Sequence, residues 1–154
     1  MPLYELLSAE RVAILGTPGD RNAVLETAAR LLSGGDPRTA AALDAGLRER
    51  ERLASTAIGH GVAIPHGRSP LLETGCGAFL RLAQPVDFGA ADGEPVDLVL
   101  AMAVPEHHVQ QHLQLLAELA ERFADPAFRD CLRSAPDAAE LSQRLLERCR
   151  RSAA

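Results

Sequence analysis

Histidine is the side chain best suited to act as a nucleophile or proton carrier near neutral pH, and His66 has the most constrained setting of the five in this chain. It follows Pro65 and precedes Gly67, after a run at residues 56–64 in which β-branched residues alternate with glycine. That run predicts a strand with tight turns. A strand that leads into a turn at His66 would lift the imidazole out of the sheet and leave backbone N–H groups near it.

A phosphoryl group is the ligand that this setting suits. A phosphorylated imidazole needs hydrogen-bond donors around its oxygens, and Arg50, Arg68, Thr56 and nearby backbone amides are in reach along the chain. Because phosphoryl transfer depends mainly on positioning and charge stabilisation, one nucleophile in such a cradle is enough. From these residues alone, a hydrogen-bonded turn histidine without any chemistry is the alternative, and it is the more common case.

The other histidines carry weaker signals. His112 lies on the apolar face of a predicted helix, where a core histidine and a site residue are both open interpretations. His107 and His108 are expected to be solvated, and His60 is interpreted as an exposed turn residue rather than a third imidazole of the site. His108 and His112 have the i, i+4 spacing of metal ligands, but Val109 stands where a zinc protease needs glutamate, so no metal is expected.

Two helices are expected in the first third of the chain. Asp20 can cap a helix that ends at Gly34-Gly35, and Asp36-Pro37 opens a second helix that continues towards Arg50. The first helix carries its apolar residues on one face, and these are Val24, Leu25, Ala28, Leu31 and Leu32.

Strands are expected in the middle of the chain, over residues 76–82 and 96–104, with a short connection or edge strand at 85–88. The segment 96–104 is almost wholly apolar, as a strand covered on both faces would be. Because helices flank this group of strands, the pattern predicts an α/β layered domain.

Two more helices follow these strands. One is expected over residues 106–124, where Asp125-Pro126 ends it, and the last begins after a capping box at residues 134–137. The residues predicted to be buried are Val109, His112, Leu113, Leu116, Ala120 and Phe123 in the first, and Ala138, Leu141, Leu145 and Cys149 in the second.

Length and composition narrow the function classes. A chain of 154 residues predicts one domain over residues 1–154, and a net charge of −5 with no Trp excludes nucleic-acid binding as the main role. The start lacks the features of a signal peptide, and the longest apolar run, at 98–105, is too short to cross a bilayer. Cys76, Cys131 and Cys149 lack Cys-x-x-Cys spacing, which suits reduced thiols in the cytoplasm.

The segment from Arg50 to Arg68, R-E-R-L-A-S-T-A-I-G-H-G-V-A-I-P-H-G-R, resembles a family signature. It is the signature of the EIIA proteins of the bacterial phosphotransferase system, in the fructose, mannitol and nitrogen-regulatory branch. The resemblance covers residues 6–146, about the core of the predicted domain. Further matches in the same order are P-V-D-F at 85–88, G-E-P-V-D-L-V-L-A-M-A-V-P at 93–105 and H-L at 112–113.

This resemblance implies a mixed β-sheet sandwiched between helices, the fold of mannitol- and fructose-type EIIA proteins. It implies that His66 accepts a phosphoryl group from the carrier HPr or its nitrogen-branch counterpart, with Arg50 and His112 as the other catalytic residues. Thr56 and the adjacent Ser55 are the implied phosphate-binding side chains, and no metal or organic cofactor is required. Arg68 is left open between a phosphate contact and a partner-docking charge.

Three residues depart from the family pattern. Ala54 and Ala57 stand where glycine is common, and His60 stands where asparagine is frequent. Because alanine tolerates positive φ poorly, the conformation of the loop at these positions is left open.

The resemblance leaves three roles to weigh. The absence of an EIIB, HPr or membrane segment in the chain favours a regulatory, nitrogen-branch EIIA with target proteins of its own. An EIIA of a fructose- or mannitol-type sugar uptake system, which would hand phosphate to an EIIB, is the first alternative. A binding module that keeps the fold but no longer turns phosphate over is the second. The sugar, the recipient and the oligomeric state are not predicted.

Overall fold

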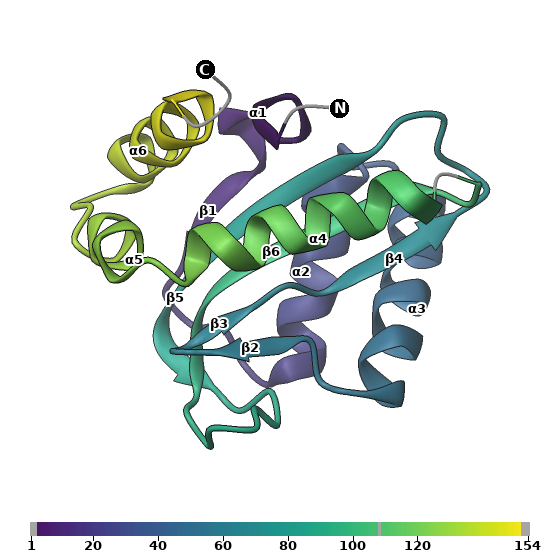
Figure 1. Ribbon diagram of the computed structural model, residues 1–154. Coiled ribbons are helices and arrows are strands. Elements are labelled where there is room, and N and C mark those ends of the chain that lie inside the picture. Colours follow the sequence, from purple (N-terminus) through teal and green to yellow (C-terminus); the bar gives the residue numbers. More distant parts are fainter. Residues whose placement is uncertain (1–2, 108, 152–154) are drawn as a thin grey trace.

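The computed structural model describes residues 3–107 and 109–151, and a six-stranded sheet forms the centre of this part (Figure 1). The strand order is β1-β5-β6-β3-β2, and β4 also pairs with β6. Because β6 is parallel to β3 and β4 but antiparallel to β5, the sheet is mixed. The strands are β1 (Val12–Leu15), β2 (Ala57–Gly59), β3 (Val62–Ala63), β4 (His66–Ser69), β5 (Cys76–Val86) and β6 (Val96–Pro105).

Helices cover both faces of the sheet, which confirms the predicted α/β sandwich. Two helices, α2 and α3, lie on one face, and α4, α5 and α6 lie on the other (Figure 1). The helices are α1 (Leu3–Leu6), α2 (Arg21–Leu32), α3 (Pro37–Leu53), α4 (Val109–Phe123), α5 (Pro126–Arg133) and α6 (Ala138–Arg151), with a 3-10 turn, η1 (Ala9–Arg11), before β1.

Strand β6 is buried along almost its whole length, as its apolar run predicted. Its side chains alternate between two cores, and the smaller ones face α2 and α3. The two sets are Leu98, Leu100 and Met102 beneath α4, α5 and α6, and Val99, Ala101 and Ala103 beneath α2 and α3.

The predicted starts of α2 and α3 are confirmed. The Asp20 carboxylate accepts a hydrogen bond from the N–H of Ala23 (2.8 Å), and Asp36 caps α3 in the same way with Pro37 in the first turn. Since α3 continues to Leu53, Arg50 lies in its last turn.

The buried face predicted for α4 is partly wrong. Leu113 is 59% exposed, and α4 begins at Val109 rather than at residue 106. Apolar residues lie on both sides of His112 around the helix, and only the direction of the sheet decides which side is buried. The side chain of Val109 and all of His108 lie outside the part of the chain that the structure describes. The buried residues of α4 are His112, Leu115, Leu119 and Phe123.

The C-terminal region also differs from its prediction. Asp125 and Pro126 start α5, with Asp125 accepting from the N–H of Ala127 (3.0 Å), as Asp36-Pro37 start α3. In α6, Ala138 is exposed rather than buried, because the inward stripe starts at Leu141. The N-cap of α6 is Asp137, whose carboxylate accepts a hydrogen bond from the N–H of residue 140 (2.8 Å). The predicted start of the last helix after residue 137 is confirmed, but the capping box predicted at 134–137 is wrong, and β1 was not predicted.

Candidate functional site

A strand that continues the line of β3 positions His66. Both β3 and β4 pair with β6 in one register, with Val62 opposite Leu98 and His66 opposite Met102. The carbonyl of Pro65 accepts a hydrogen bond from the N–H of Met102 (2.9 Å). The pairing with β6 therefore continues through Pro65, although proline has no N–H to donate. His66 is therefore the first residue of β4, and the turn predicted there is wrong.

Gly67 serves the packing of α3 rather than a turn. A Cβ at Gly67 would lie 3.4 Å from the carbonyl carbon of Gly46 and 3.6 Å from the nitrogen of Leu47. The two glycines therefore let α3 and β4 approach through their backbones. Arg50 lies one helical turn after Gly46, on the same face of α3, which brings it beside His66.

The His66 ring makes a hydrogen bond through each nitrogen. Nδ1 lies 2.8 Å from the carbonyl oxygen of Ile64, and Nε2 lies 3.2 Å from Nε of Arg50. A carbonyl oxygen only accepts and a guanidinium only donates, so Nδ1 carries the proton and Nε2 holds the lone pair. The nucleophilic atom of this imidazole is therefore Nε2.

Arg50 is held at two points by uncharged acceptors. Its Nε donates to His66, and its Nη1 donates to the carbonyl of Ala54 (2.8 Å). Within residues 3–107 and 109–151, no carboxylate forms an ion pair with Arg50. A positive charge therefore lies beside Nε2 without a carboxylate to pair it.

His112 reaches the same place from α4. Its ring centroid lies 5.0 Å from that of His66, with the two planes at 55°, and the residue is only 7% exposed. Its Nδ1 is buried and has no hydrogen-bond partner among the described residues. An unmet acceptor is more readily tolerated than an unmet N–H, so this environment favours the tautomer with the proton on Nε2.

Burial lowers the pKa of both imidazoles. For His66 the burial effect is the largest, and the Arg50 cation also lowers the pKa, while the bond to Ile64 raises it. For His112, burial lowers the pKa to about 4, and repulsion from His66 in its protonated form and from Arg68 and Arg50 lowers it in the same direction. Both rings are therefore uncharged near neutral pH.

Four of the six predicted site residues, His66, Arg50, Arg68 and His112, line one cavity of about 1000 Å³. Its rim carries Leu53 and Leu113, which are 68% and 59% exposed. The remaining residues along its wall are Gly46, Glu49, Gly67, Glu106, His107 and Leu116.

Ser55 and Thr56, the other two predicted residues, do not line this cavity. The Ser55 hydroxyl donates to the carbonyl of Phe88 (2.5 Å). Thr56 is 6% exposed, and its hydroxyl donates to the carboxylate of Glu51 (2.9 Å). Both hydroxyls therefore bind acceptors outside the cavity lining, Ser55 that of Phe88 after β5 and Thr56 that of Glu51 in α3.

The burial of Glu51 beside the site is not predicted from the sequence. The alternating charges at residues 48–52 are typical of a solvated helix face, yet Glu51 is 3% exposed. The available signal was the spacing to Thr56, five residues later and just beyond the helix end, because a Thr there can offer both its N–H and its hydroxyl to a carboxylate.

Of the three departures from the family pattern, only His60 lies in the left-handed region. His60 is an exposed turn residue, as interpreted, with a φ of 56°, in the left-handed region where asparagine is also enriched. Its N–H donates to Asp92 (2.9 Å). Ala54 has a φ of −167°, which any residue adopts, so no glycine is required there.

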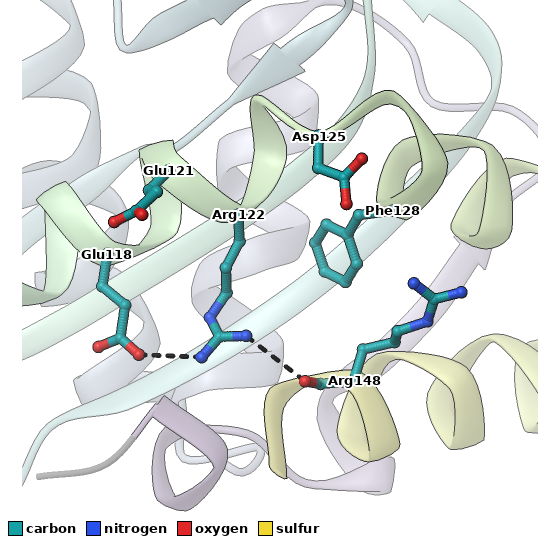
Figure 2. A pocket seen from close by; sticks show the side chains of 6 residues that line it. All are labelled: Glu118, Glu121, Arg122, Asp125, Phe128 and Arg148. Atoms are coloured by element: carbon teal, nitrogen blue, oxygen red, sulfur yellow. Dashed lines mark hydrogen bonds and ion pairs between the residues drawn. The ribbon is translucent and has the colours of Figure 1, made fainter. Parts of the chain in front are cut away.

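A second, smaller pocket of about 380 Å³ lies between α4, α5 and α6 (Figure 2). Arg122 lies at its centre and donates to Glu118 (3.0 Å) and to the carbonyl of Arg148 (3.4 Å). None of the residues predicted for the site lies in this pocket.

The described residues contain no group of three or more His, Cys, Asp or Glu side chains arranged to hold a metal ion. They also contain no helix with the length and apolar character needed to cross a membrane.

Known proteins with related sequences match nearly the whole chain. The model of the family described as "Phosphoenolpyruvate-dependent sugar phosphotransferase system, EIIA 2" matches residues 5–148. A nitrogen regulatory protein of Bradyrhizobium diazoefficiens is 39% identical over 141 residues, which are 90% of each chain. One from Pseudomonas aeruginosa is 39% identical over 142 residues, 92% of each chain.

Solved structures agree with the fold. The crystal structure of the nitrogen regulatory protein IIA-Ntr from Neisseria meningitidis superposes with a TM-score of 0.84 at 35% identity, covering 93% of this chain and 98% of that one. The structure of IIA mannitol from Escherichia coli superposes with a TM-score of 0.72 at 23% identity, covering 90% and 98%.

Proposed function

Because the chain belongs to the EIIA 2 family of the phosphoenolpyruvate-dependent sugar phosphotransferase system, we propose that it is a phosphocarrier that accepts a phosphoryl group on Nε2 of His66. The donor is an HPr-type protein carrying a phosphohistidine. The observation that carries the proposal is the tautomer of His66, whose Nδ1–H is bound to Ile64 and whose Nε2 lone pair faces the Arg50 guanidinium.

The transfer exchanges one nitrogen–phosphorus bond for another. The Nε2 lone pair forms the new bond to phosphorus while the bond to the donor's imidazole breaks, and the donor nitrogen keeps the electron pair. The His66 ring gains positive character, which the Ile64 carbonyl on Nδ1 stabilises. The same positive character makes the phosphoryl group easy to pass to a further acceptor.

Arginine charges supply the electrostatic part of catalysis. Arg50 donates to Nε2 before transfer and turns its donors to the phosphoryl oxygens once that lone pair is used. Arg68 is exposed on the same cavity wall and adds a second positive charge. We assign it to phosphate contact, since it projects beside the nucleophile on the same strand.

His112 is the proposed neutral donor. Its pKa of about 4 keeps it uncharged, and a proton on Nε2 gives it one N–H to offer to a phosphoryl oxygen. The ring centroids lie 5.0 Å apart, so the two imidazoles are in contact and a phosphoryl group on His66 would lie beside His112. The role of Ser55 and Thr56 is then indirect, through the loop after α3.

A partner protein would dock on the rim of the cavity. Leu53 and Leu113 expose apolar side chains next to the nucleophile, whereas a monomer normally keeps such residues scattered. The neighbour IIA mannitol has been solved in complex with phosphorylated IIB mannitol, so an EIIB-type protein is a candidate recipient. The HPr-type donor and the recipient would use this face in turn.

A regulatory, nitrogen-branch role is the version that the relatives support best. The nitrogen regulatory proteins of B. diazoefficiens and P. aeruginosa align over nine-tenths of both chains. The fructose-specific EIIA component of Haloferax volcanii aligns over 60% of this chain, which keeps the sugar-uptake role as the second candidate. We further propose that residues 1–154 act as one EIIA domain in the cytoplasm, where the donor is found.

The experiment is reconstitution with the organism's own HPr-type carrier, enzyme I and phosphoenolpyruvate. Intact mass should show the gain of one phosphate, and the product should be labile in acid and stable in alkali, as a phosphoramidate is. A protein that gains no phosphate, or one that forms an acid-stable ester, contradicts the proposal.

A further inference from the structure

Glu51 is a buried carboxylate close to the cavity but outside its lining. Its two oxygens accept the N–H of Thr56 (2.9 and 3.3 Å) and the Thr56 hydroxyl (2.9 Å). A carboxylate is kept inside a protein only when such bonds replace its hydration. Within the described residues, all hydrogen bonds that the Glu51 side chain accepts thus come from Thr56, at the far end of the α3–β2 loop.

The position of Glu51 is unfavourable for stability alone. It lies in the last turn of α3, where the helix dipole is negative and disfavours an anion. Burial raises its pKa, although the Thr56 bonds and the charges of Arg21 and Arg50 oppose that shift. The charge of Glu51 is therefore unfavourable both at the helix end and in the interior, so stability alone does not explain this residue.

The Glu51–Thr56 contact closes the loop around the carbonyl that orients Arg50. Ala54 lies between the two clamped residues, and its carbonyl accepts from Nη1 of Arg50 (2.8 Å). The same guanidinium donates through Nε to His66 (3.2 Å). If the loop opened, the Ala54 carbonyl would move and Arg50 would keep only one of its two contacts.

We infer that Glu51 is a positioning residue for phosphoryl transfer, which through Thr56 fixes the Ala54 carbonyl and so holds Arg50 on His66. The inference rests on the proposed phosphocarrier function and adds to it a residue that never touches the phosphoryl group. It also explains why Thr56 belongs to the matched motif although its hydroxyl is directed to Glu51.

The test compares initial rates of phosphate uptake in three variants. Glu51→Gln places an amide against the Thr56 donors and should slow uptake about tenfold, and Thr56→Val should slow it about threefold. The matched control is Asp44→Asn, which removes a carboxylate that pairs with Arg48 on the same helix and lies outside the cavity. Its rate should equal that of the wild type. If Glu51→Gln fails to fold, Thr56→Val tests the inference in its place, because it removes only the hydroxyl.

A cycle with Arg50 separates positioning from general destabilisation. In an Arg50→Ala background, Glu51→Gln should cause no further loss of rate, because the contact it supports is already absent. If the two losses multiply, or if both Glu51→Gln and Thr56→Val transfer phosphate at the wild-type rate, the inference is wrong.

A readout that does not need activity distinguishes this inference from the proposed function. An NMR titration of His66 should show a higher pKa in Thr56→Val, which changes no charge, and in Arg50→Ala, because the Arg50 cation that lowers it is displaced or absent. An unchanged His66 pKa in Thr56→Val, with a raised one in Arg50→Ala, overturns the inference. Failure of the wild type to take up phosphate overturns the proposed function instead.

Discussion

Arg50 and Arg122 line different cavities and differ in whether a carboxylate pairs with their charge. In the α4–α6 pocket, Arg122 donates to the carboxylate of Glu118 (3.0 Å), so its charge is neutralised within the fold (Figure 2). In the His66 cavity, the hydrogen bonds that Arg50 donates within the described residues go to an imidazole nitrogen and a carbonyl. An anion that entered this cavity would therefore meet a cation without an ion pair, whereas at Arg122 it would meet an ion pair.

Helix α4 connects these two regions. Near its start, His112 faces the cavity with an uncharged ring, and near its end, Arg122 faces the pocket with an ion pair. Both have a buried nitrogen without a hydrogen-bond partner in the described part of the chain, Nδ1 of His112 and Nε of Arg122. An unmet buried nitrogen is thus no sign of function by itself, and the charge environment is what distinguishes the two regions.

The largest effect is expected at the nucleophile. His66→Ala should abolish phosphate uptake, because it removes the imidazole whose Nε2 lone pair faces the Arg50 guanidinium. Intact mass after incubation with the phosphorylated carrier measures this. Phosphate that still appears on Ser55, His60 or His112 of the variant would show that His66 is not the acceptor.

Next in size is the loss of the unpaired cation. Arg50→Ala should lower the rate of phosphate uptake about 10- to 100-fold, since one charge-assisted contact contributes about 1.5–3 kcal/mol. Because Arg50 makes its contacts at the surface of the cavity, the melting temperature should change little. Stopped-flow or quenched-flow uptake together with a thermal melt checks both halves, and an unchanged rate would remove Arg50 from the catalytic residues.

A smaller effect on the rate is expected at the neutral donor. His112→Gln keeps a donor and similar bulk, so uptake should fall by about three- to tenfold while stability falls slightly. His112→Ala should lower uptake at least as much. Normal uptake combined with a large loss of melting temperature would make His112 a core residue instead.

His112 should also contribute to the pH dependence of the free energy of unfolding. Between pH 6.5 and 4 the unfolded chain binds a proton at His112 that the folded chain, with a pKa of about 4 there, does not bind. The free energy of unfolding should therefore fall as pH decreases through this window, by up to about 1.4 kcal/mol per pH unit for this group. Urea unfolding at several pH values should give a shallower slope for His112→Gln, and equal slopes would contradict the assignment of a neutral, buried ring.

The smallest effect is expected at the paired arginine. Arg122→Gln removes an ion pair whose glutamate is 42% exposed, so stability should fall by about 1 kcal/mol or less. Phosphate uptake should stay at the wild-type rate. A loss of uptake comparable to that of Arg50→Ala would mean that pairing is not what separates the two regions.

Structural features that depend on residues adjacent in the sequence were predicted correctly. The caps at Asp20 and Asp36, the apolar strand at 96–104 and the helix end near Arg50 each follow from a few adjacent residues. Asp125-Pro126 shows the limit of such patterns, because the same dipeptide that opened α3 was interpreted only as the end of α4. Local chemistry permits both interpretations, and only the packing of Phe128 and Leu132 into the core selects the helix.

By itself, the sequence determined the layered α/β fold, the family and the segment that holds the candidate nucleophile, since periodicity and motif spacing are local properties. Tertiary structure alone decided the geometry of the site. It directed Leu113 outward and Leu115 inward, because the position of the sheet chooses which side of an apolar helix is buried. It also brought Glu51 to Thr56 and, within the described residues, left Arg50 without an ion pair, because charge pairing depends on distances in space that spacing along the chain does not contain.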